Sequence, residues 1–340
     1  MGLGGLLPRA AAEAGPRTGA GPGVGAGAAA GTEAKARRTV PAARRTRIRG
    51  QRLNFWIFVG PFLAGMLLFV FVPIGWSVYL SLFQATGTVA PSRWAGFGNY
   101  LALLKQGPFT DSLVTFTVFA LFIVPVTFAL SLGMALLLQR VRIARTFFRS
   151  AFFLPTACSY VVASLIWRMS IFSGTRFGLV NTVLGWFGVS PIAYLGPPSP
   201  PWYWVVIITV RLWLQLGFYM ILFVAALQRI PQELYEAAWV DGASPGWKTF
   251  RHITLPQLRA TSVAVLLLLL IAAYQAFDEF YNLIPNAPYA RPPLEYLYYT
   301  ALGTDQDYGL GSAGALILSA LIMIATLLQG KVMGFGKAGD

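Results

Sequence analysis

Six long runs of apolar residues follow one another along the chain, and they limit its fold more than any other feature. The runs cover residues 55–83, 113–138, 147–172, 202–227, 261–284 and 310–328. A helix of about 20 residues is long enough to cross the ~30 Å hydrocarbon core of a membrane. We therefore predict an all-α integral membrane protein in which six transmembrane helices occupy residues 53–335.

The composition supports a membrane protein and excludes several other classes. Charged residues make up 11% of the 340 residues and apolar residues 56%, whereas soluble domains carry about 25% charge. A purely soluble globule and a disordered chain are both excluded by this balance. The single cysteine, Cys158, and the single histidine, His252, exclude a disulfide framework and a His/Cys metal cluster. We expect no cofactor and no metal.

The chain begins with a segment of different composition. Glycine and alanine supply 20 of the first 34 residues, and ten lysines and arginines lie between Arg9 and Arg52. This pattern predicts a disordered basic tail over residues 1–52, held at an anionic membrane surface. A twin-arginine export signal is rejected because the apolar run that follows is far too long. Residues 336–340 form a second, short tail.

The basic residues also predict the orientation of the spans. With the N-terminus inside the cell, 20 of the 26 lysines and arginines fall in inner segments and four in outer loops. Because basic residues accumulate on the cytoplasmic side of membrane proteins, both termini are predicted to be cytoplasmic, in the inner or plasma membrane. The net charge of +14 follows from this topology, so it does not indicate nucleic-acid binding.

The predicted inner loop over residues 229–260 carries the most information. Pro231 suits the first position of a helix, and Gly242 suits a left-handed stop. Ser244 and Pro245 then suit the start of a second helix, which Pro256 should end. We predict two short helices joined by a glycine turn on the cytoplasmic face.

This loop resembles the EAA motif of ABC-importer permeases, and the chain resembles their carbohydrate branch. The matching residues in the loop are Glu236, Ala237, Ala238, Gly242, Ile253, Leu255 and Pro256, with one residue more than the family pattern between Gly242 and Ile253. Further similar stretches are residues 96–100, 153–155, 225–231 and 309–313. Residues 283–288 depart from the sequence that relatives often carry after the fifth span.

The resemblance implies a non-catalytic subunit with a type I importer architecture. In this family two permease chains form the pathway, two cytoplasmic ATPase subunits drive it, and an external solute-binding protein delivers the sugar. The resemblance assigns contact with the ATPase to the first of the two predicted loop helices, which we call the coupling helix. The residues that it implicates are Glu236, Ala237, Ala238 and Gly242. The chain has no phosphate-binding G-x4-G-K-[ST] loop, so ATP hydrolysis is expected on a separate chain.

Ionisable residues inside the predicted spans are the candidates for the transport pathway, because charges within a membrane are rare and usually functional. Arg211 and Asp278 fall at similar depths, so Arg211 is expected to pair with Asp278 or Glu279 if spans four and five are neighbours. Such a pair either holds the spans together or lines the pathway. The pathway candidates are Arg211, Gln215, Tyr274, Gln275, Asp278 and Tyr281, the last four of which, with Asn282, lie on one face of a continuous helix.

Three other functions compete with a sugar importer. A permease of the same branch for a solute such as glycerol-3-phosphate would share every motif above. A secondary carrier predicts internal inverted repeats, and none is convincing. A membrane enzyme predicts catalytic residues clustered at one membrane face, whereas Asp278 and Glu279 are adjacent and point about 100° apart on a helix, so they cannot flank one bond.

Overall fold

The structure is a computed structural model, and it describes residues 55–105, 107–141, 143–196, 198–242, 246–303 and 305–333. The predicted tails over residues 1–52 and 336–340 lie outside the described residues. The chain divides into two compact units, Met1–Leu63 and Ala64–Asp340. The described part of the first unit is helical, and the features below belong to the second unit.

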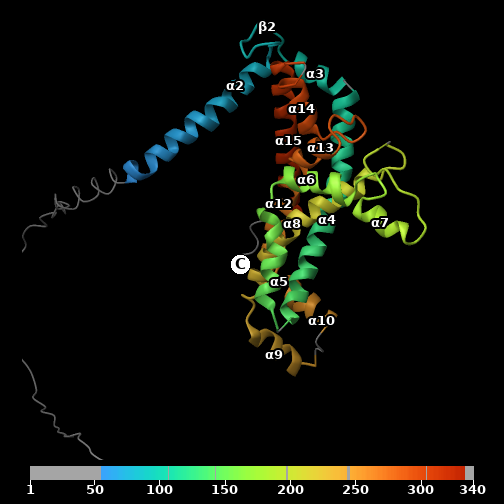
Figure 1. The fold of residues 1–340 in the computed structure, drawn as a ribbon. Helices are drawn as coiled ribbons and strands as arrows, with labels where there is room; N and C mark the ends of the chain where they lie inside the picture. The colour runs from blue at the N-terminus through green and yellow to red at the C-terminus, as the bar shows by residue number, and fades with distance from the viewer. Residues whose placement is uncertain are drawn as a thin grey trace, which may run out of the picture. The chain divides into compact units, whose positions relative to one another are not determined.

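Helices dominate the described residues (Figure 1). From the first strand onward, the elements are, in order, β1 (Phe83–Gln84), β2 (Arg93–Trp94), α3 (Gly98–Lys105), α4 (Gly107–Arg140), α5 (Arg145–Phe153), η2 (Leu154–Ala157), α6 (Tyr160–Ile166), η3 (Trp167–Ile171), α7 (Leu179–Gly185) and α8 (Tyr203–Leu227). After α8 follow α9 (Gln232–Val240), α10 (Trp247–Thr249), η4 (Phe250–Thr254), α11 (Leu255–Gln257), α12 (Arg259–Tyr274), α13 (Asp278–Leu283), α14 (Pro293–Ala301) and α15 (Tyr308–Met333). Before them lie η1 (Leu67–Phe71) and α2 (Val72–Ser81). The two strands pair antiparallel.

Four helices in the described residues are long and apolar enough to cross a membrane: Phe55–Ser81, α4, α8 and α15. Two bent pairs supply up to two more spans. Arg145–Ala157 and Tyr160–Ile171 meet at 98°, and Trp247–Gln257 and Arg259–Tyr274 meet at 72°. The six predicted spans match the larger count. The third is bent, and the bent pair that supplies the fifth covers residues 247–274 instead of the predicted residues 261–284.

The bend in the third span has a local cause. Pro155 lies in the short 3-10 helix η2, and Cys158 after it is extended, with ψ of 142°. The Ser159 hydroxyl then accepts the N–H of Val161 and caps the start of α6. A proline followed by a capped restart is a sufficient reason for the chain to change direction here.

The fifth span breaks without any such cause. Helix α12 ends at Tyr274, α13 begins at Asp278, and Phe277 between them has φ of −149°. The expected continuous helix over residues 261–284 is therefore wrong. No glycine or proline lies between residues 259 and 284, so contacts with other helices must maintain the break.

Helices α4, α8 and α12 form the centre of the second unit, and α15 packs against α2, α12 and α14. Aromatic rings fill the junction of α4, α8 and α13. The Phe116 and Phe280 ring centroids lie 4.9 Å apart, and Phe119 stacks on Trp204 at 5.3 Å. Helix α13 is therefore fixed on one side by the core, next to the break in span five.

Candidate functional site

The predicted coupling helix is present as α9, Gln232–Val240. It begins directly after Pro231 and is followed by Gly242, whose φ of +80° confirms the predicted left-handed stop. Residues 243–245 lie outside the described part, so the expected start at Ser244 and Pro245 is not described. The second helix is predicted to end at Pro256, and the helical run ends one residue later, at Gln257, where the chain bends by 72°. Pro256 lies in the first turn of α11, directly after the π-helical turn η4.

Helix α9 has no buried residue. Glu236 and Ala237 are exposed, Ala238 is half-buried, and the apolar side chains of Trp239 and Val240 are 47% and 87% exposed. One contact that fastens this helix is a 3.1 Å hydrogen bond between the hydroxyls of Tyr235 and Thr254. An exposed helix with small and apolar side chains is suited to contact a partner.

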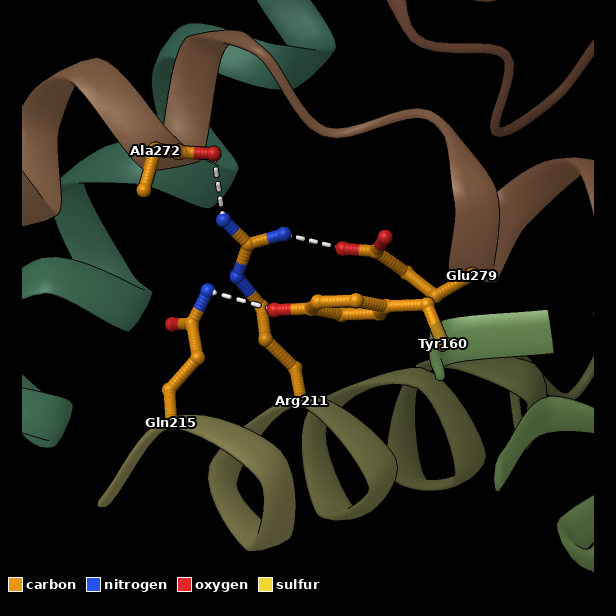
Figure 2. Close-up of polar contacts among 5 residues, drawn as sticks. All are labelled: Tyr160, Arg211, Gln215, Ala272 and Glu279. Carbon is orange, nitrogen blue, oxygen red and sulfur yellow. Dashed lines mark hydrogen bonds and ion pairs between the residues drawn. The ribbon is translucent and has the colours of Figure 1, made fainter. Parts of the chain in front are cut away.

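The predicted charged pair inside the spans is formed by Arg211 and Glu279. Both residues are 2% exposed, and a guanidinium Nη1 donates to a carboxylate oxygen of Glu279. Figure 2 shows this contact between α8 and α13. Asp278, the other predicted partner, is exposed. The prediction that Arg211 binds one of these two carboxylates is confirmed, with Glu279 as the partner.

Two further hydrogen bonds surround this pair (Figure 2). Nη2 of Arg211 donates to the backbone oxygen of Ala272 at 2.5 Å. Gln215, one turn farther along α8, donates from Nε2 to the Tyr160 hydroxyl at 2.8 Å. These polar contacts therefore link α6, α8 and both halves of the broken span.

The predicted polar face of span five does not exist as one surface. Tyr274 is 5% exposed and donates to Thr117 Oγ1 of α4 at 3.2 Å, so it packs into the protein. Gln275 and Asp278 are exposed, and Tyr281 and Asn282 are half-buried. The reason is the break after Tyr274, because helical spacing no longer relates residues on its two sides.

Two polar residues that sequence reasoning missed contact the segment that follows the break in span five. Arg168 donates from Nη1 to the Asn282 backbone oxygen at 3.1 Å. Glu295 on α14 is 1% exposed and accepts the N–H of Asn286 at 2.9 Å. Burial raises the pKa of Glu295, and the Asn286 N–H and the positive charge of Arg291 oppose that rise. No sequence motif marks these contacts, because each joins segments that only folding brings together.

Residues 95–332 match the family model described as the inner membrane component of binding-protein-dependent transport systems. This chain belongs to that family. The match covers helix α9, the buried ion pair and the broken span.

Curated relatives of this permease resemble it over most of their length. The trehalose/maltose transport system permease protein of Thermococcus litoralis is 31% identical over 286 residues, which are 83% of this chain and 94% of the relative. The arabinooligosaccharides transport system permease protein of Bacillus subtilis is 32% identical, over 83% and 89% of the two chains. The diacetylchitobiose uptake system permease protein of Streptomyces coelicolor is 30% identical, over 87% and 88%.

A solved structure shares the fold of the permease. It is a chain of a bacterial ABC transporter involved in the import of the acidic polysaccharide alginate, with a TM-score of 0.75 and 21% identity, over 85% of this chain and 98% of that one. The predicted all-α membrane architecture of the type I importers is therefore confirmed. In the described residues, no group of three His, Cys, Asp or Glu side chains could hold a metal ion.

Proposed function

We propose that this permease forms half of the pathway through which an ATP-driven, binding-protein-dependent importer moves an oligosaccharide or a sugar derivative. Its curated relatives are named for trehalose and maltose, arabinooligosaccharides and diacetylchitobiose. The observation that carries the proposal is the pair of exposed polar side chains at the break in span five, Gln275 and Asp278.

The depth of these side chains favours a pathway over a lipid-facing surface. Helix α12 contributes 16 residues before the break, which corresponds to ~24 Å along the helix axis. On the predicted topology, in which the fifth span begins at residue 261, Gln275 and Asp278 lie within the ~30 Å span of the hydrocarbon core. An exposed carboxylate and a broken backbone at that depth are tolerated where they line a water-filled cavity or contact protein.

The chemistry of the two side chains suits a sugar. The Asp278 carboxylate accepts hydrogen bonds from hydroxyl groups, and the Gln275 amide both donates and accepts them. Tyr281, half-buried on α13, adds a ring face against which the C–H surface of a sugar ring can lie. Gln215 and Tyr274 instead make bonds within the protein, so their proposed contribution to the pathway is to hold its walls.

The exposed helix α9 supplies the coupling part of the proposal. We place Glu236, Ala237, Ala238 and Gly242 at the contact with a cytoplasmic ATPase dimer. The small alanine side chains allow close approach of another protein surface, and the apolar side chains beside them lack cover in this chain. A second permease, an external solute-binding protein and membrane lipid complete the proposed partners, with both termini of the chain in the cytoplasm.

Substitution of the two pathway residues tests the proposal. Gln275→Leu and Asp278→Asn should each lower uptake of the transported sugar while the complex still assembles. Gln139→Leu is a matched control, since Gln139 is exposed near the end of α4 and lies outside both the break and residues 229–260. Uptake kinetics that stay at the wild-type values in both pathway variants would remove these residues from the pathway.

The partners are tested by purification of the tagged chain from its native host in mild detergent, followed by mass spectrometry. The proposal predicts an ATPase and a second permease in stoichiometric amounts. A chain that purifies alone, and that still moves solute into vesicles without ATP, would refute the importer and favour a secondary carrier.

A further inference from the structure

We propose that Arg211 is a positioning residue that holds open the break in span five. This inference deepens the proposed function, because the break exposes Gln275 and Asp278. It starts from a geometric fact: Arg211 contacts span five at two points, and the break lies between them. Figure 2 shows the guanidinium between Ala272 on one side and Glu279 on the other.

The first contact replaces a lost helical bond. In a continuous helix the carbonyl of Ala272 would accept the N–H of Ala276. Here the Ala276 N–H bonds to the Ala273 oxygen instead, at 3.3 Å. Nη2 of Arg211 donates to the Ala272 oxygen. The cation also lies at the C-terminal end of α12, where the helix dipole favours positive charge.

The second contact fixes the other side of the break. Glu279 lies in the first turn of α13, where the helix dipole favours a negative charge. Its carboxylate pairs with Nη1 of the same guanidinium. One side chain from α8 thus contacts a backbone oxygen at the C-terminal end of α12 and a carboxylate in the first turn of α13. Both contacts would change if span five became continuous.

No residue in the break itself explains the interruption. Residues 275–277 are glutamine, alanine and phenylalanine, none of which prevents a helix. Removing the clasp formed by Arg211, Ala272 and Glu279 should therefore let residues 275–277 sample helical and broken conformations. The pathway side chains on either side would then lose their fixed spacing.

The test is Arg211→Lys, which keeps the positive charge but replaces the planar fork with a single nitrogen. An ordinary ion pair between spans would survive this change, whereas the clasp would not. Arg168→Lys is the matched control, because Arg168 also donates to a backbone oxygen of span five, beyond the break. We expect the Arg211→Lys complex to assemble and to transport about tenfold more slowly, and the control to transport at the wild-type rate.

A distance measurement separates positioning from a general loss of structure. Spin labels attached at Leu268 and Pro285, both exposed, report the spacing across the break in a Cys158→Ser chain within the complete complex. Arg211→Lys should broaden this distance distribution, whereas Arg168→Lys should leave it unchanged. Wild-type transport, or slow transport with an unchanged distribution, would overturn the clasp. The distance reports the break whether or not Gln275 and Asp278 contact the sugar.

If Arg211→Lys does not assemble, the double variant Arg211→Gln with Glu279→Gln replaces the ions with neutral amides of similar shape. Removing both charges avoids an unpaired buried ion. The clasp predicts an assembled complex with a broad distance distribution and slow transport. A narrow, wild-type distribution in this variant would show that Arg211 does not hold the break.

Discussion

At the scale of single residues, Gly217 sets how closely two spans approach. A β-carbon at this position would overlap the Phe152 carbonyl oxygen and lie 2.9 Å from the Phe153 α-carbon. Helix α8 therefore touches the backbone of span three at this position, directly before its bend. A methyl group here must push α8 away from that bend.

We predict that Gly217→Ala destabilises the folded permease, by the ~1–3 kcal/mol that overpacking costs in a filled interior. The midpoint of thermal unfolding in detergent measures the effect and should fall. Gly133→Ala is the control, because a β-carbon at Gly133 of α4 meets no atom within 4 Å. Equal midpoints for the two variants would contradict the close approach.

Asn181 holds together the segment that joins the third and fourth spans. It is 3% exposed, and its amide donates to the backbone oxygens of Ser173, Thr175 and Ile192. Its oxygen accepts the N–H of Ile192 at 3.1 Å. One side chain thus joins both ends of this connection.

We predict that Asn181→Ala loosens the connection, because buried backbone groups lose partners worth about 1 kcal/mol each. Trypsin cleavage after Arg176, the only lysine or arginine between residues 172 and 202, should become several-fold faster. Val183→Ala is the control, since Val183 is an exposed residue of the same helix α7 and its side chain cannot hydrogen-bond. Cleavage at the wild-type rate in Asn181→Ala would contradict this role.

At the scale of elements, composition and turn chemistry predict much of the structure. The apolar runs predict the long helices, and Pro231 and Gly242 predict the ends of α9. The break after Tyr274 could not be predicted, because no local residue causes it and the proposed support is the contact of Arg211 with Ala272, 61 positions later in the chain. Because the helix ends at Tyr274, the prediction that Tyr274 shares one polar face with Gln275, Asp278 and Tyr281 is wrong.

Helix α9 gives a prediction at this scale. Ala237→Trp should block close contact with the ATPase by steric overlap, so ATP hydrolysis no longer drives uptake although the two permeases still copurify. Gln232→Trp is the matched control on the same helix, since Gln232 is a long, exposed side chain in the first turn of α9. The sugar-stimulated ATPase activity of purified complexes measures the effect. Full coupling in Ala237→Trp would contradict a docking role for the small residues.

At the scale of the whole molecule, the described residues expose more apolar surface than a soluble monomeric protein does. Only 33% of the strongly apolar stretch of α4 is buried, and only 22% of the corresponding stretch of α15. Lipid and a partner permease are the environments that can cover such helices. The apolar side chains of the exposed helix α9 are a further uncovered surface, which the proposed ATPase would cover. Transport by this chain is thus expected only in an assembly.

The most direct test of this account is uptake of a radiolabelled oligosaccharide into vesicles that contain the purified complex. The account predicts accumulation that requires both ATP on the side of α9 and the solute-binding protein on the other side. Complexes with Ala237→Trp should accumulate no sugar under the same conditions. Accumulation by vesicles that contain this chain alone, without ATP, would contradict the account.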